Sequence, residues 1–168
     1  LFGKPPTPRS LQRIGMVFQN PEDQLFMPSV LEDAVLPLVN RGVPQEAAQD
    51  RAREALVRAG LGEALDRPAS RLSLGERKRA SIAAALVSSP DLLLLDEPTA
   101  ELDGRSVRQL ATLLTGLSVT RLIASHHLEF LRGVCARLLV LEHGRLIAQG
   151  PAGEILGDRE LLERTGLV

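Results

Sequence analysis

The stretch DLLLLDEPTAELD, residues 91–103, decides how the chain is interpreted. Its unbroken run of leucines is typical of a strand that is buried on both faces of a parallel sheet. The run ends at two adjacent carboxylates, Asp96 and Glu97, and Pro98 then stops the strand. Because open α/β sheets place their sites at the carboxyl ends of the strands, this acid pair predicts a metal–phosphate site.

The two acids can take different roles, since successive residues of a strand face opposite ways. We expect Asp96 to hold Mg²⁺ through water, and Glu97 to orient or deprotonate an attacking water. The alternative is a solvated strand end that carries two surface acids. For an isolated Asp-Glu pair this alternative is the better interpretation, so the choice depends on the other motifs.

Composition limits the classes of protein that the chain can belong to. The chain has 168 residues, of which 44% are hydrophobic and 24% charged, as in ordinary globular domains. A formal net charge of −1 argues against an electrostatic nucleic-acid binder. The single cysteine, Cys135, excludes an internal disulfide and fits a reducing compartment. No apolar run approaches the roughly 18 residues of a membrane span.

Hydrophobic spacing predicts a helical block followed by an α/β block with an antiparallel edge. The expected strands cover residues 13–18, 92–95 and 121–125, and the last two are expected to be buried. The expected helices cover residues 29–39, 44–59, 75–87 and 103–116. Residues 138–141 and 146–149 flank His143-Gly144 and predict a hairpin.

Ser73 and Gly75 come immediately before or at the start of a predicted helix, in the segment RLSLGERKRASIAAAL (71–86). A helix N-terminus has free backbone N–H groups and a partial positive charge, so it favours phosphate. Ser73 would add a hydroxyl donor, and Gly75 would let a backbone approach closely. The alternative is a plain capping box, because Glu76 follows Ser73 by three residues. Taken alone, the capping interpretation is the stronger one.

Polar residues also follow the other predicted strands. His126 comes after the strand RLIAS and is placed to hydrogen-bond a terminal phosphate. The adjacent His127 suggests a metal site, but only His143 remains as a further histidine, and structural zinc requires four convergent ligands. Gln19 ends the first predicted strand, where a glutamine is usually just solvated.

Taken together and in order, these motifs resemble those of the ATP-binding subunit of ABC transporters. FQNPEDQLF (18–26) resembles the Q-loop with Gln19, and LSLGE (72–76) the signature motif usually written LSGGQ. LLLLDEP (92–98) resembles Walker B with Glu97 as catalytic base, AELD (100–103) the D-loop with Asp103, and SHH (125–127) the switch-histidine segment with His126. QNPEDQLF, HLEFL and the tail PAGEILGDRELLERTGL are most similar to the cobalt/nickel and energy-coupling-factor importers.

The resemblance implies a fold and a set of site residues. The fold is a P-loop NTPase-like α/β core, partial, with an inserted helical subdomain. Residues 20–88 would hold the Q-loop, helical subdomain and signature helix, and residues 89–168 the rest of the core. The implied catalytic residues are Glu97 and His126, the nucleotide contacts Gln19, Ser73, Gly75, Glu76 and Asp103, and the Mg²⁺ ligands Asp96 and Gln19.

The resemblance also implies partners and a mechanism. Two ATPase subunits would stack head to tail, so that the Ser73/Gly75 face of one closes over the ATP and Mg²⁺ held by the other. Closure and hydrolysis would drive a transmembrane subunit through the loop after Gln19. The protein would work at the cytoplasmic face of the membrane, without nucleic acid. The solute, and whether the pair is a homodimer or heterodimer, stay open.

Three departures from the family pattern qualify this expectation. Leu74 replaces a glycine of the signature motif, and His127 stands where an acid is common. The phosphate-binding sequence G-x-x-x-x-G-K-[ST] is absent, and Gly3-Lys4 is no substitute because it lacks the upstream glycine. Since the family places this loop well upstream of the Q-loop, we expect the chain to lack the N-terminal third of the domain.

Two alternatives follow from these departures. In the first, the chain is a non-catalytic interaction module that donates its signature face to another ATPase. In the second, the ATPase serves DNA repair or translation, but the coiled coil or tandem second ATPase domain of such proteins is absent. The expected complete protein is therefore an importer ATPase, and the chain alone is expected to be inactive.

Overall fold

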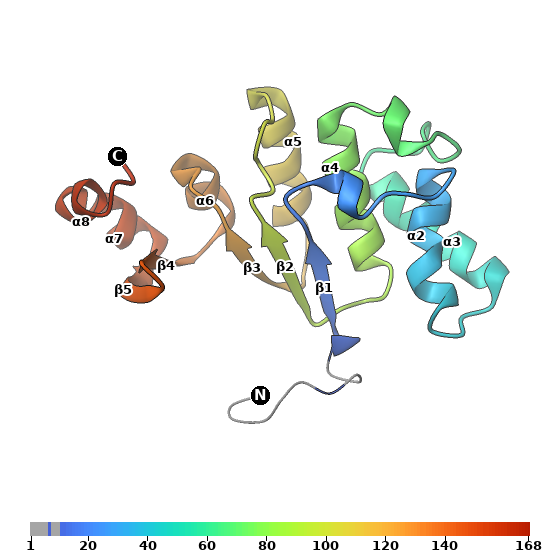
Figure 1. The fold of residues 1–168 in the computed structure, drawn as a ribbon, viewed down its shortest axis with the longest axis horizontal. Helices are drawn as coiled ribbons and strands as arrows, with labels where there is room; N and C mark the ends of the chain where they lie inside the picture. Colours follow the sequence, from blue (N-terminus) through green and yellow to red (C-terminus); the bar gives the residue numbers. More distant parts are fainter. Residues whose placement is uncertain (1–6, 8–10) are drawn as a thin grey trace.

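Three parallel strands form the central sheet in the order β1 (Ile14–Val17), β2 (Leu92–Asp96) and β3 (Thr120–Ala124). The structure is a computed structural model that describes residue 7 and residues 11–168, so Gly3 and Lys4 lie outside the described residues. Val17 pairs with Leu95, and Asp96 pairs with Ala124. The carboxyl ends of all three strands therefore meet at one edge of the sheet (Figure 1). All three predicted strands are confirmed.

A helical block lies beside β1 and contains α2 (Val30–Val39), α3 (Gln45–Arg58) and α4 (Leu74–Leu86). Two 3₁₀ turns, η1 (Pro21–Asp23) and η2 (Ala69–Arg71), lie in its connections. Ser29 caps α2 by accepting a hydrogen bond from the Glu32 N–H at 3.2 Å, and Pro44 precedes α3. These helices pack around a core of their own that includes Val30, Leu38 and Leu56. The predicted helices are confirmed to within a residue or two.

A second core lies between the sheet and the helices α4, α5 (Gly104–Thr115) and α6 (Leu128–Val134). Its most buried members, each with 0% exposure, are Val17, Ile82, Leu93, Leu110 and Leu114. Helix α4 contributes to both cores, because Ala80 and Ala83 face the helical block and Ile82 faces the sheet. Helix α4 thus connects the two cores, and Leu113 of α5 also packs against both.

The predictions that β2 is buried on both faces and that β3 is a buried strand were wrong. Leu93 is fully buried, but its neighbours Leu92 and Leu94 on the opposite face are only half-buried. Leu122 of β3 is 54% exposed, and Met16 of β1 is also exposed. Among the described residues, helices cover one face of this sheet and leave the other open. An apolar run signals affinity for a core, but it cannot show how many faces a core covers.

The predicted hairpin is confirmed as β4 (Arg137–Glu142) and β5 (Arg145–Pro151). His143 and Gly144 have φ values of 47° and 76°, as a two-residue turn of the mirror-image type requires. The expected antiparallel edge of the main sheet was wrong, because the described strands form two separate sheets and β4 pairs only with β5. The hairpin instead packs with α7 (Ala152–Gly157), which is followed by α8 (Arg159–Arg164). Figure 1 shows this unit beyond β3.

Leu93 and Leu122 are leucines on strands of the same sheet, one buried and one exposed, so their substitution tests which face of the sheet packs against a core. We expect Leu93→Ala to lower the free energy of unfolding by about 2–5 kcal/mol, because it opens a cavity in the core. Leu122→Ala should change it by no more than about 0.5 kcal/mol, because this side chain is largely solvated. Urea denaturation of both variants measures the difference. Equal losses would contradict the one-sided core.

Candidate functional site

The acid pair lies at the carboxyl edge of the sheet, where β2 ends. Asp96 is the last residue of the strand and its side chain is exposed. Glu97 has a positive φ of 40°, and its N–H donates to the carbonyl of Ala124 at 2.9 Å. A non-glycine residue in this region costs about 1–3 kcal/mol and needs surrounding contacts to hold it. This turn, rather than strand alternation, separates the directions of the two carboxylates.

The Glu97 carboxylate is held by the segment that follows β3. Its Oε1 lies 2.8 Å from His126 Nδ1 and accepts the His126 backbone N–H at 3.2 Å, while Oε2 accepts the Ser125 hydroxyl at 3.2 Å. An ionised carboxylate only accepts hydrogen bonds, so this contact with an ionised Glu97 requires a form of His126 that has a proton on Nδ1. Glu97 is 23% exposed and His126 78%. The structure thus brings together the two residues predicted to be catalytic.

His127 has a local structural role. Its Nδ1 accepts the Phe130 N–H at 3.1 Å and so caps α6. His143 lies in the hairpin turn. In the part of the chain that the structure describes, no three His, Cys, Asp or Glu side chains are grouped so that they could hold a metal ion.

Ser73 and Glu76 form the capping box that the sequence suggested. The Glu76 N–H donates to Ser73 Oγ at 3.3 Å, and Glu76 Oε2 accepts both the Ser73 N–H and the Ser73 hydroxyl at 2.8 Å. These hydrogen bonds, that of the hydroxyl first, lower the pKa of Glu76. The capping interpretation is confirmed. A phosphate contact of Ser73 stays a prediction, and it would compete with the hydroxyl's bond to Glu76.

Gly75 and Asp103 are packed against each other through Ser106. A Cβ on Gly75 would lie 2.7 Å from Ser106 Oγ and 3.0 Å from Ser106 Cβ, so a larger residue would force Ser106 to shift. The Ser106 N–H donates to Asp103 Oδ1 at 2.7 Å, which caps α5 and lowers the pKa of Asp103. Ser73, Gly75, Glu76 and Asp103 line one cavity of about 370 Å³.

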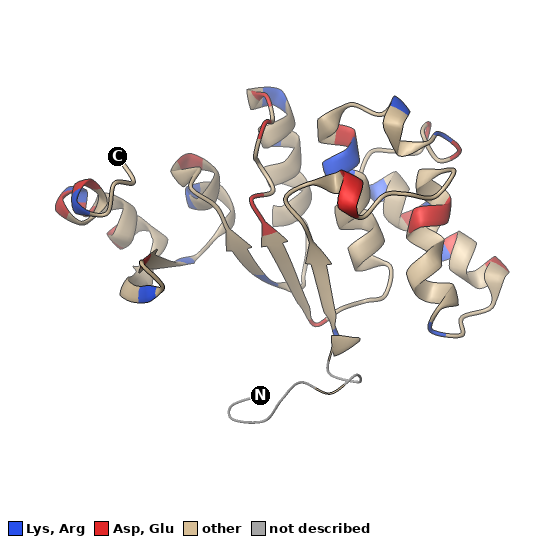
Figure 2. Ribbon diagram, in the orientation of Figure 1, with Lys and Arg blue, Asp and Glu red and all other residues tan. Residues whose placement is uncertain are grey.

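Gln19 and Asp96 line a second cavity, of about 570 Å³. Leu74 and Glu101 line both cavities, so the two are neighbours. Gln19 is exposed, and its carbonyl accepts a hydrogen bond from Lys78 Nζ at 2.6 Å. Figure 2 shows acidic segments at the end of β2 and at η1, near the basic residues 77–79 of α4. Gln19 and Asp96 offer the oxygen donors that Mg²⁺ prefers, which fits their predicted role.

Sequence reasoning missed the residues that shape the loop after Gln19. Gln24 extends the edge of β1: its Oε1 accepts the Phe18 N–H at 2.9 Å, and its Nε2 donates to the Met16 carbonyl at 2.8 Å. Asp33 Oδ1 accepts the N–H groups of Phe26 and Met27, each at 3.0 Å. Burial raises the pKa of Asp33. From the sequence alone, Asp33 cannot be distinguished from the acidic residues that commonly occupy the first turn of a helix.

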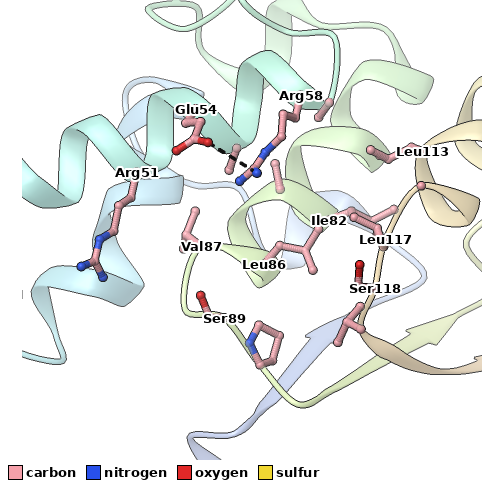
Figure 3. A pocket seen from close by; sticks show the side chains of 16 residues that line it. Arg51, Glu54, Arg58, Ile82, Leu86, Val87, Ser89, Leu113, Leu117 and Ser118 are labelled. Atoms are coloured by element: carbon pink, nitrogen blue, oxygen red, sulfur yellow. Dashed lines mark ion pairs between the residues drawn. The ribbon is translucent and has the colours of Figure 1, made fainter.

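A third cavity, of about 610 Å³, lies away from this edge (Figure 3). It is bounded by α3, α4, the end of α5 and the segments that lead into β2 and β3. Ile82, Leu86 and Leu113 contribute apolar surface, while Arg58 and its ion-pair partner Glu54 lie at 3.5 Å from each other. It lies at the amino ends of the strands and contains none of the predicted site residues. Cavity size alone therefore does not identify the site.

The motifs of this edge agree with a comparison to known families. The protein-family model described as ABC transporter matches residues 3–100, more than half of the chain. The chain belongs to the ABC transporter family. The resemblance inferred from the motifs is thereby confirmed.

Curated relatives of this ABC chain have transport-related names. It is 46% identical over 156 residues to a putative ABC transporter ATP-binding protein of Gloeobacter violaceus, covering 92% of the chain and 64% of the relative. It is 40% identical to the energy-coupling factor transporter ATP-binding protein EcfA of Methanothermobacter thermautotrophicus, covering 93% and 51%. It is 39% identical to the nickel import ATP-binding protein NikO of Rhodobacter capsulatus, covering 94% and 64%. The chain thus spans less than two thirds of these relatives.

Solved structures confirm the ABC ATPase fold. The structure of CbiO1 from Clostridium perfringens, described as part of the ABC transporter complex CbiONQ, matches with a TM-score of 0.81 and 37% identity. The match covers 94% of the chain and 64% of CbiO1. The ATP-binding cassette MJ0796, a dimer bound to ADP and phosphate, matches with a TM-score of 0.74 and 28% identity, covering 86% and 66%. The predicted fold class, a partial α/β ABC core, is confirmed.

The free energy of unfolding of this ABC chain depends on pH through Glu76, and the direction of the pKa shift fixes the sign of that dependence. The pKa of Glu76 in the folded chain is below the ordinary value of 4.5. The ionised carboxylate therefore stabilises the folded chain above pH 4.5, and this stabilisation is lost as the pH falls through the folded-state pKa. Glu76→Gln keeps a capping acceptor but no charge. We expect the stability difference between wild type and this variant to shrink from neutral pH to a pH below 4.5, as measured by urea unfolding. A difference that grows in acid would contradict the capping role.

Proposed function

We propose that this chain is the part of an importer ATPase that carries the catalytic base, the switch histidine and the signature face. The observation that carries the proposal is the contact of Glu97 with His126 and Ser125 beside the exposed Asp96. The complete protein would hydrolyse ATP. The similarity to EcfA, NikO and CbiO1 supports an importer of the energy-coupling-factor or cobalt/nickel type.

Glu97 is suited to act as a general base. Its carboxylate is partly shielded from solvent, and its two oxygens are fixed by groups from the end of β3. A fixed carboxylate can accept a proton from a water only if that water reaches the same oxygens. The exposed His126 ring covers one of them, so movement of this ring would control access of water and of a terminal phosphate to Glu97.

Asp96 and Gln19 would hold Mg²⁺, and Ser73, Gly75, Glu76 and Asp103 would contact the nucleotide bound to a partner. When bound, Mg²⁺ neutralises charge that develops on the phosphates. The free N–H groups at the start of α4 favour a phosphate approaching along the helix axis. Leu74 adds an apolar side chain at this helix start, between the two cavities.

The partners would be a second ABC ATPase subunit, identical or not, and a transmembrane subunit, at the cytoplasmic face of the membrane. The dimeric cassette MJ0796 and the CbiONQ complex named for CbiO1 support this arrangement. Phe26 is 68% exposed in the loop after Gln19, and Asp33 fixes the backbone there, which gives a membrane subunit an apolar contact. None of the described helices combines the length and apolar character needed to cross a membrane.

A non-catalytic interaction module is the second candidate. It is favoured by one observation: the 168 residues contain no G-x-x-x-x-G-K-[ST] sequence. Phosphate affinity in such sites comes mainly from the backbone cradle and its lysine. In this case the chain would offer its signature face to another ATPase without turning over ATP itself.

Glu97→Gln tests the catalytic proposal in a protein in which this chain follows the phosphate loop of a relative. We expect ATP turnover to fall by about 10²–10⁴-fold while nucleotide binding is kept, because the amide cannot accept the proton. Glu129→Gln, an exposed acid on α6, is the matched control and should leave turnover unchanged. Phosphate release and calorimetry measure the two quantities. Full turnover in Glu97→Gln would exclude Glu97 as the base.

Calorimetry with Mg-ATP tests whether the chain by itself can hold the nucleotide. We expect no binding in the micromolar range to the 168-residue chain, because the phosphate cradle is absent from its sequence. The same chain joined to a phosphate loop is the control and should bind. Micromolar affinity of the chain alone would show that its own residues hold the phosphates.

A further inference from the structure

Lys78 of α4 is buried to a degree that is rare for a lysine. It is 2% exposed and ranks among the largest fully buried side chains. Its Nζ donates to the carbonyl oxygen of Gln19 at 2.6 Å and to that of Glu97 at 3.2 Å. The ammonium is therefore satisfied by backbone and not by a carboxylate in direct contact.

The two carbonyls belong to separate strands. Gln19 follows β1 by two residues and Glu97 follows β2 directly, and the two are brought together only by the sheet. Lys78 reaches them from the helix that begins with Leu74 and Gly75. One ammonium thus connects the loop after β1, the turn after β2 and the signature helix. Because both acceptors are main-chain atoms, this connection does not depend on the side chains at positions 19 and 97.

The contact with Lys78 stabilises an unfavourable backbone conformation at Glu97. Its positive φ of 40° is unfavourable for a residue with a side chain, and such a conformation persists where neighbours fix it. The Glu97 carbonyl accepts from both Lys78 and the Ala100 N–H, and the Glu97 N–H bonds to Ala124. Asp96, Glu97 and Glu101 also attract the ammonium, which offsets part of the cost of its burial.

We propose that Lys78 is a positioning residue that ties the Gln19 loop and the Glu97 turn to the signature helix. Removal of the ammonium would free the two segments to move independently of α4. An effect of Lys78 on turnover rests on the proposed function, because Lys78 would act through Glu97. The connection between the two segments and α4 does not rest on that function, and it can be tested in the chain alone.

Hydrogen exchange of the chain measures the connection. Lys78→Met keeps a long unbranched side chain without donors, and it should raise exchange of the Glu97, Ala100 and Gln24 amides about tenfold or more. Amides of α3 should exchange as in wild type. Lys78→Gln retains a donor and should give a smaller increase. Ile82→Val, one turn along the same helix and equally buried, is the control for lost packing and should not single out these amides.

The exchange results distinguish a positioning role of Lys78 from a role in which its side chain only fills space in the core. A selective increase at the two segments, larger for Met than for Gln, supports the proposal. An increase spread evenly over the chain, or the same pattern in Ile82→Val, overturns it. If Lys78→Met does not fold, the comparison of Lys78→Gln with Ile82→Val decides in the same way.

Turnover is then measured in the chain joined to a phosphate loop. Lys78→Met should lower kcat with little change in KM, and Lys78→Gln should restore part of kcat. Unchanged kcat despite selective exchange would overturn the catalytic consequence of positioning. Full turnover of Glu97→Gln would instead overturn the proposed function, and the exchange result on the chain alone would stand.

Discussion

The parallel pairing of β1, β2 and β3 is the constraint on which the rest of the structure depends. It places Val17 beside Leu95 and Asp96 beside Ala124, so chain segments far apart in sequence end at the same edge. The Glu97–His126 contact is a direct consequence, since each residue follows a paired strand end. A shift of register by one residue would move the side chains of a strand to the other face and separate this pair.

Helix α4 transmits this constraint to the helical block. Its small residues Ala80 and Ala83 pack in the core of the block, whereas Ile82 packs in the core under the sheet. Because tightly packed cores deform little, the start of α4 is fixed relative to both bodies. The close approach of Gly75 to Ser106 then fixes the cap of α5 at the same point. The start of α4 and the cap of α5 are therefore in direct contact through Ser106.

Local rules made much of this fold predictable from the sequence. Ser29 and Ser73 mark helix starts, and His143-Gly144 marks a turn, because capping and turn chemistry depend on a few neighbouring residues. Burial was less predictable: Leu93 and Leu122 lie in similar apolar runs, yet one is buried and the other exposed. Which face a core covers depends on elements elsewhere in the chain. The separation of the hairpin from β3 has the same origin.

The residues of the candidate site could be predicted from the sequence, whereas the contacts that fix their positions could not. The Asp-Glu pair, the glutamine and the histidine follow strands in the sequence, which locates them at one edge. Lys78 looks like one member of a short basic cluster, although its i, i+4 spacing from Leu74 and Ile82 places it on an apolar row of α4. Its partners are carbonyls 59 and 19 residues away, and a sequence pattern cannot name them.

The different surroundings of Asp96 and Glu97 have a cause that the strand pattern did not reveal. Alternation along β2 would have sufficed if both residues belonged to the strand, but β2 ends at Asp96. The positive φ of Glu97 turns its carboxylate toward Ser125 and His126, and leaves Asp96 exposed beside the Gln19 cavity. A strained turn thus directs one carboxylate to the segment after β3 and leaves the other at the cavity that Gln19 lines. The contacts that maintain this turn therefore keep the two carboxylates apart, as the proposed division of their roles requires.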